Sequence, residues 1–175
     1  MADALETMRT RRSIRHYRPD PVPRELIGQV IEAGLYAPSG KNGQSTIILA
    51  VTDRETRDQL SRLNAEIMEA EPGTDPFYGA PAVLVVLADR SYPNWQYDGP
   101  VVMENLLLAA HALGLGACWI HRAKQTFARP EGQAILQKLG VEGDFEGIGN
   151  CILGWPDGDL PAPAPRKDGR VFWME

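Results

Sequence analysis

Cysteines and long hydrophobic runs are scarce in this sequence, and each shortage excludes a class of protein. The two cysteines, Cys118 and Cys151, lie far apart inside apolar segments, so neither a disulfide scaffold nor a cysteine-based metal site is expected. No uninterrupted apolar run is long enough to span a bilayer, and the first residues lack the pattern of a secretory signal. We therefore expect a protein that has no membrane contact and works in the cytoplasm.

Familiar catalytic motifs are also missing. The chain has no nucleophile elbow, no P-loop and no GxGxxG that opens a helix, which leaves the common hydrolase, nucleoside-triphosphatase and Rossmann interpretations without support. Its three histidines, His16, His111 and His121, are scattered without the spacing of metal ligands. We predict no metal site and interpret none of the histidines as a ligand.

The charge is acidic overall but unevenly distributed. A net charge of -5 and a sequence pI near 5.3 argue against nucleic acid as a partner, because nucleic-acid binding needs a basic surface. Arginines nevertheless crowd the first 24 residues, and cations return near the other end at Arg166, Lys167 and Arg170. Two basic clusters in an acidic protein suggest a binding site for a small anion.

Hydrophobic periodicity divides the chain, residues 1–175, into alternating helices and strands of a single domain. The content of hydrophobic residues, 43%, is that of an ordinary globular protein. Spacing and breakers predict helices over residues 3–12, 23–36, 55–69, 101–115 and 130–139. They predict strands over 46–51, 82–88, 117–121 and 147–153, with an added edge strand over 171–173. This pattern is typical of a three-layer α/β or α+β sandwich.

Two short segments carry groups suited to ligand binding. The run Arg11-Arg12-Ser13-Ile14-Arg15 offers guanidinium forks, which match phosphate oxygens in pairs, and a serine hydroxyl between them. A solvated basic segment would have the same composition. The loop Ser39-Gly40-Lys41-Asn42-Gly43-Gln44 offers amides and hydroxyls that can bind the edge of a heterocycle, although such residues also form ordinary turns. From the residues alone, both interpretations of each segment stay open.

Taken in order, five segments of the chain resemble the pattern of the nitroreductase family. The first three are Arg11 to Arg15, Ala37 to Gln44, and Phe77-Tyr78-Gly79-Ala80-Pro81 before a strand. The last two are Leu113 to Ile120 and Ile152 to Pro156, the latter followed by Arg166-Lys167. The resemblance spans nearly the whole chain, and the order of the five segments makes it specific.

The resemblance implies an α+β fold, a three-layer α-β-α sandwich with a central and mainly antiparallel sheet. It also implies an interlocked homodimer with one FMN per site, held between the two chains. In such a site the ribityl phosphate and the pyrimidine edge of the flavin would be held by Arg11, Arg12, Ser13 and Arg15, with Arg166, Lys167 and Arg170 joining at the phosphate.

Two further segments would contact the flavin ring if the resemblance holds. Ser39, Asn42 and Gln44 would reach it from the partner subunit. Trp119, Ile120 and His121 would lie along the isoalloxazine, with a backbone N–H from Ile120, His121 or Arg122 near flavin N5. A donor there suits the electron density that N5 gains on reduction.

The reaction that the resemblance implies is a ping-pong hydride transfer. NADH or NADPH would stack on the exposed flavin face, deliver hydride to N5 and leave. An electron-poor small molecule, such as a nitroaromatic or a quinone, would then take the same place, and no catalytic side chain is needed because the chemistry belongs to the flavin. Two alternatives stay open: a specialised flavin enzyme that dehalogenates, fragments flavin or desaturates its substrate, and a non-catalytic flavin-binding or redox-sensing protein.

This sequence departs from the common family pattern at two places. Many relatives have Pro-Trp after the glutamine, where this chain has Ser45-Thr46, so a large aromatic wall is missing from the expected pocket. The pair His121-Arg122 replaces the acidic-glycine pair that some relatives have beside N5. We expect the first change to alter the shape of the pocket, and the second to alter the redox potential or the preference for an acceptor.

Overall fold

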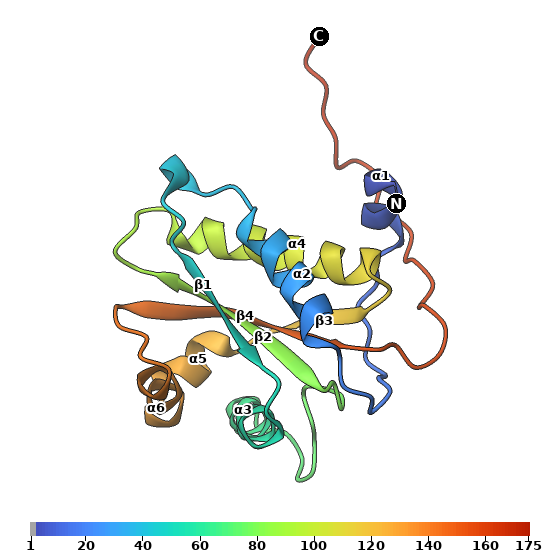
Figure 1. The fold of residues 1–175 in the computed structure, drawn as a ribbon. Helices are drawn as coiled ribbons and strands as arrows, with labels where there is room; N and C mark the ends of the chain where they lie inside the picture. Colours follow the sequence, from blue (N-terminus) through green and yellow to red (C-terminus); the bar gives the residue numbers. More distant parts are fainter. Residues whose placement is uncertain (1–2) are drawn as a thin grey trace.

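The computed structural model describes residues 3–175 and contains one four-stranded sheet between two layers of helices (Figure 1). The strands are β1 (Thr46–Val51), β2 (Ala82–Asp89), β3 (Gly116–Ile120) and β4 (Phe145–Gly154). Their order in the sheet is β1-β2-β4-β3, and every neighbouring pair is antiparallel. The predicted α+β sandwich with an antiparallel sheet is confirmed.

Six α-helices and one short 3-10 turn accompany the sheet in the described residues. Helices α2 (Arg24–Leu35) and α4 (Trp95–Ala112) cover one face, whereas α3 (Arg54–Ile67), α5 (Ala123–Ala128) and α6 (Pro130–Lys138) cover the other (Figure 1). Helix α1 (Ala4–Thr10) lies at the margin, close to the C-terminal tail, and the turn η1 is Gly40–Asn42. No helix in residues 3–175 is both long enough and apolar enough to cross a membrane.

The core lies on both faces of β2, which explains why this strand is apolar from Ala82 to Ala88. Ala82, Leu84 and Val86 point into the core beneath α2 and α4, and the alternate residues Val83, Val85 and Leu87 point into the core above α3, α5 and α6. Side chains of a strand alternate between faces, so a strand covered on both sides needs hydrophobic residues at every position. These six side chains are at most 2% exposed.

Helix ends follow the expected capping chemistry. Asp53 precedes α3 and accepts a hydrogen bond from the Thr56 backbone N–H at 2.9 Å, which satisfies one of the free donors of the first turn. Pro130 occupies the first position of α6, where a missing N–H costs nothing. These local signals place α3 and α6 within two residues of their predicted ends.

Three elements differ from the sequence-based predictions. Helix α4 begins at Trp95, well before the predicted start at residue 101, and runs through Pro100. The six-residue helix α5 was not predicted, because a single short helix leaves no periodic signal. The predicted edge strand over residues 171–173 is wrong: Phe172 and Trp173 are 89% and 84% exposed in an extended tail that pairs with no strand of the described chain.

Candidate functional site

The two basic clusters of the sequence meet at one cleft beside the end of α1. Arg11, Arg12 and Ser13 line one side, and the segment 163–166, which ends in Arg166, lines the other. The cleft has a volume of about 740 Å³. We refer to it as the basic cleft.

The position of this cleft is fixed by the strand at the edge of the sheet. The backbone N–H of Ile14 donates to the carbonyl of Ala117 in β3 at 3.0 Å, and Ser13 forms a bridge with the same residue. A Cβ at Gly116 would lie 2.9 Å from Ile14, so a glycine is needed for this approach. The result is that Arg11 to Ser13 are held against β3 rather than projecting freely.

Two buried donors of the arginines that line the basic cleft have no partner in residues 3–175. Arg12 Nη1 donates to the carbonyl oxygens of Arg9 and Arg11 at 2.8 and 2.7 Å, which orients its guanidinium. Arg11 Nη1 and Arg12 Nε are buried yet donate to no described group. Burial, with the charges of Arg11 and Arg12, lowers the pKa of His111. The cleft therefore offers buried donors to an anion.

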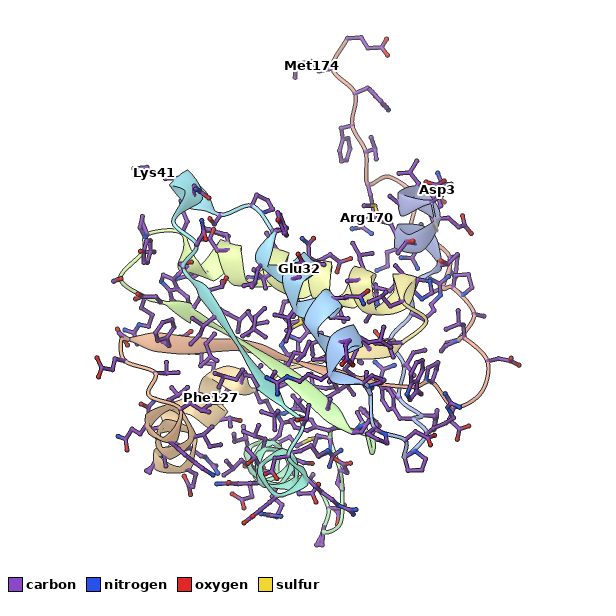
Figure 2. All side chains as sticks on the ribbon, in the orientation of Figure 1. Asp3, Glu32, Lys41, Phe127, Arg170 and Met174 are labelled. Atoms are coloured by element: carbon purple, nitrogen blue, oxygen red, sulfur yellow. The ribbon has the colours of Figure 1, made fainter. Side chains whose placement is uncertain are left out.

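Other predicted cations lie outside the basic cleft. The Arg15 guanidinium is 6.0 Å from the centre of the Tyr78 ring, a cation–π arrangement on the surface. Lys167 and Arg170 are in the exposed tail and do not line the cleft, although Arg170 lies on the same side of the molecule as Asp3 of the α1 N-cap (Figure 2). Of the residues predicted at the phosphate, Arg11, Arg12, Ser13 and Arg166 line the basic cleft of the described chain.

The loop with Ser39, Asn42 and Gln44 is an ordered and exposed turn. The Ser39 hydroxyl accepts a hydrogen bond from the Gln44 N–H at 3.0 Å, and Gln44 Nε2 lies 3.4 Å from Asn42 Oδ1. Lys41, Asn42 and Gln44 all have positive φ, at 54°, 54° and 46°. Figure 2 shows Lys41 and Asp3 on opposite sides of the helical layer, so this loop does not meet the basic cleft of its own chain.

The segment from Trp119 to Arg122 lines a second cleft, of about 560 Å³, at the end of β3. Trp95 also lines this cleft, and the ring centres of Trp119 and His121 are 5.7 Å apart. A Cβ at Gly149 would overlap the Trp119 indole, so the glycine makes room for it. Ile120 itself is buried in the core. Of the four residues, three are therefore available to a ligand.

Comparison with known proteins shows to which family the chain is related. Residues 8–155 match the profile of the Nitroreductase family. The chain belongs to the nitroreductase family. A relative from Methanothermobacter thermautotrophicus, named "Putative NADH dehydrogenase/NAD(P)H nitroreductase", is 36% identical over 121 residues, which are 67% of this chain and 60% of that protein.

Two further comparisons concern flavin directly. An FMN reductase (NAD(P)H) from Bacillus subtilis is 35% identical over 188 aligned positions, covering 95% of this chain and 70% of that protein. A crystal structure of a nitroreductase with bound FMN from Bacteroides fragilis superimposes with a TM-score of 0.88 and 28% identity, and both chains are covered completely. The fold expected for the nitroreductase family is thus found along the full chain.

Three buried polar residues that hold the ligand segments of this nitroreductase-family chain were not identified from the sequence. Asp98, only 5% exposed, binds the loop that contains Ser39 and Gln44. Asn64 and Asn150, 0% and 1% exposed, bind the backbone at the end of β3. Only Asn150 has a signal in the sequence, because it is a polar residue inside the otherwise apolar segment Gly147 to Leu153.

The cysteines of this nitroreductase-family chain are structural. Cys118 and Cys151 are 2% and 0% exposed and lie on neighbouring strands, β3 and β4. Burial raises the pKa of Cys151 to about 12, which keeps the thiol protonated. Nothing in this environment makes either sulfur a nucleophile.

Proposed function

We propose that the chain works as a homodimer that binds FMN and transfers hydride from NADH or NADPH to an electron-poor small molecule such as a nitroaromatic or a quinone. The basic cleft carries the proposal, because guanidinium groups from both ends of an acidic chain lie together there. The FMN reductase from Bacillus subtilis and the FMN-bound nitroreductase from Bacteroides fragilis support the choice of cofactor and electron donor.

The residues of the basic cleft fit the phosphate of FMN. Buried Arg11 Nη1 and Arg12 Nε lack partners in residues 3–175, and a buried unpaired donor costs free energy. Phosphate oxygens accept from guanidinium groups in pairs and suit such donors. In the proposed complex Arg11, Arg12 and Arg166 neutralise the phosphate, and the Ser13 hydroxyl adds a neutral hydrogen bond. Arg15, Lys167 and Arg170 are proposed to lie at the periphery of this site.

The end of β3 is proposed to hold the flavin ring. When bound, FMN supplies the hydride chemistry, which no side chain of the protein can perform. The chain contributes an aromatic surface from Trp119 and His121, and a backbone N–H near N5 that stabilises the electron density arriving there. One cleft has to admit the nicotinamide and the acceptor in turn, and this predicts ping-pong kinetics.

We propose a homodimer because the single chain leaves several large apolar side chains exposed and leaves one predicted flavin-binding loop away from the basic cleft. Val171, Phe172, Trp173 and Met174 are 69% to 102% exposed in the extended tail, which is unusual for so many large hydrophobic residues in sequence. Ser39, Asn42 and Gln44 do not line the basic cleft, and Lys41 of the same loop lies on the opposite side of the helical layer from Asp3 (Figure 2). In a dimer the tail covers the second subunit, and this loop reaches the flavin of that subunit.

The test is anaerobic reduction of the purified protein. We expect a yellow protein, or one that becomes yellow with added FMN, whose absorbance bleaches with NADH or NADPH and returns with a quinone or nitroaromatic. Initial rates with both substrates varied should give parallel double-reciprocal lines, and intersecting lines would exclude the ping-pong mechanism. A yellow protein that neither nicotinamide reduces would be a flavin-binding protein, and one that cannot bind FMN would refute the proposal.

A further inference from the structure

Two buried asparagines hold the peptide groups that follow β3. The His121 carbonyl accepts a hydrogen bond from Asn64 Nδ2 of α3 at 2.8 Å and another from Asn150 Nδ2 of β4 at 3.2 Å. Asn150 Nδ2 also lies 3.2 Å from the carbonyl oxygen of Ile120. Two elements that are distant in sequence thus bind the same short stretch of backbone.

This arrangement determines where the next N–H points. The peptide bond between His121 and Arg122 is trans, so its N–H is directed opposite to its carbonyl. With the carbonyl bound to Asn64 and Asn150, the Arg122 N–H faces away from both amides. No hydrogen bond of residues 3–175 uses this N–H, which leaves it free to bind a ligand.

Arg122 shows that the backbone is constrained at this point. Its φ and ψ are 77° and 7°, in the left-handed region that is unfavourable for a residue with a side chain. Such a conformation persists only where the surrounding structure enforces it. The two bonds to the His121 carbonyl provide this constraint.

The two side-chain amides bond to the described chain through Nδ2 alone. Asn64 Oδ1 and Asn150 Oδ1 are buried and accept no hydrogen bond from residues 3–175, so each side chain leaves one polar group unpaired. An unpaired buried acceptor costs free energy, which offsets part of what the donated hydrogen bonds contribute to stability. The effect of these donors on the orientation of the backbone is not offset in this way.

We propose that Asn64 and Asn150 are positioning residues that direct the Arg122 N–H toward flavin N5. The inference rests on the proposed function, since it requires FMN at the end of β3. Neither asparagine touches the flavin; both act through the His121–Arg122 peptide. Loss of the Asn64 bond lets this peptide rotate, which weakens the hydrogen bond to N5 and slows hydride transfer while FMN stays bound through its phosphate.

The test compares Asn64→Leu with a matched variant, Asn105→Leu. Asn105 also donates its side-chain amide to a backbone carbonyl, that of Ala33 at 2.9 Å, but it joins α4 to α2 away from the β3 end. Each protein is loaded with FMN labelled with ¹⁵N at N5. We measure the N5 chemical shift, the FMN dissociation constant, and the rate of anaerobic reduction by NADPH.

For Asn64→Leu we expect a changed N5 shift, a dissociation constant within about twofold of wild type, and reduction slower by about tenfold or more, because misplaced donors lose most of their effect. Asn105→Leu should match wild type in all three. An unchanged N5 shift in Asn64→Leu, or the same change in Asn105→Leu, would overturn the inference. If Asn64→Leu does not fold, Asn64→Ala and Asn150→Leu are measured in the same way.

The same experiment separates this inference from the proposed function. Wild-type protein that binds FMN but is not reduced by NADH or NADPH would contradict the proposed oxidoreductase. Wild-type protein that is reduced at the same rate as Asn64→Leu, with the same N5 shift, would contradict only the role of the asparagines.

Discussion

The Ser45 hydroxyl donates a hydrogen bond of 2.8 Å to Asp98 Oδ2, and both side chains are buried, at 3% and 5% exposure. The other carboxylate oxygen of Asp98 accepts from the Gly40 N–H at 2.9 Å. One carboxylate in the first turn of α4 therefore binds both ends of the loop that carries Ser39, Asn42 and Gln44. Ser45 thus takes part in holding that loop.

Removing the Asp98 carboxylate should destabilise the protein and loosen this loop. Asp98→Ala leaves the Gly40 N–H and the Ser45 hydroxyl without a partner, which costs about 2–4 kcal/mol in free energy of unfolding. Urea denaturation measures it. The control is Asp144→Ala, whose carboxylate is 69% exposed and pairs with Arg90 on the surface, where the loss is about 0.5 kcal/mol. Equal losses for the two variants would show that Asp98 does not anchor the loop.

Because Arg122 has a left-handed backbone conformation, we expect glycine to be tolerated better than valine at this position. The free energy of unfolding of Arg122→Gly should lie within about 1 kcal/mol of the wild-type value. Glycine adopts the left-handed conformation without strain, but it also gives the unfolded chain more conformational entropy, so the two effects oppose each other. Arg122→Val should lose about 1–2 kcal/mol, because a β-branched residue is strained there.

Arg62, exposed in the middle of α3, provides the matched pair for this ranking. In a helix the order reverses, with Arg62→Gly costing about 1 kcal/mol and Arg62→Val roughly half as much. Urea denaturation curves of the four variants give the order of stability of glycine and valine at each position. If valine is the better residue at position 122 as well, the positive φ is not a property of the folded protein.

Asp75 organises the loop before β2 and makes its stability depend on pH. Arg57 Nη2 donates to it at 2.6 Å, the Ser61 hydroxyl also donates to it, and the backbone N–H groups of Phe77 and Gly79 donate at 2.9 and 2.7 Å. Burial alone would raise the pKa of Asp75, but these hydrogen bonds outweigh it and hold the pKa below its ordinary value.

A depressed folded-state pKa contributes stability above the unfolded pKa, about 3.9 for aspartate, and that contribution disappears as the pH falls through the lower folded value. Wild type should therefore be more stable than Asp75→Asn near pH 7, and the difference should shrink as the pH is lowered from 5 to 3. Urea titrations at several pH values measure it. A difference that grows on acidification would have the wrong sign for this mechanism.

Much of the fold could be predicted from the sequence because its signals are local. β1 was predicted with its observed ends, and β2 was predicted to within one residue, since β-branched apolar runs between turn residues identify buried strands. The start of α4 was missed because Trp95 to Pro100 contains aromatic residues and proline, which favour a loop locally. That turn is helical because Asp98 binds Gly40 and Ser45 far away in sequence.

Some residues of the candidate site could likewise be predicted from the sequence, and others could not. The arginines near the start could be identified by residue type, but only the folded chain shows that Arg166, rather than Lys167 or Arg170, lines the basic cleft with them. The roles of Asn64 and Asn150 depend on a contact with His121, which lies 57 and 29 positions away. No local pattern encodes a contact of this kind.

If the basic cleft binds the phosphate of FMN, its arginines should affect the affinity for FMN but not for a flavin without phosphate. Arg12→Gln and Arg166→Gln each remove a cation from opposite ends of the chain, while Arg54→Gln, with a side chain 94% exposed, is the control. Each arginine of the cleft should contribute about tenfold to FMN affinity, since a charge-assisted hydrogen bond is worth about 1.5–3 kcal/mol. The affinity for riboflavin, which lacks the phosphate, should not change with either substitution.

Fluorescence titration of the flavin-free protein with FMN and with riboflavin tests the account most directly. We predict that FMN binds more tightly than riboflavin by about 100-fold or more, and that both Arg12→Gln and Arg166→Gln reduce this ratio. Equal affinity for the two flavins, or a ratio that Arg166→Gln leaves unchanged, would contradict it.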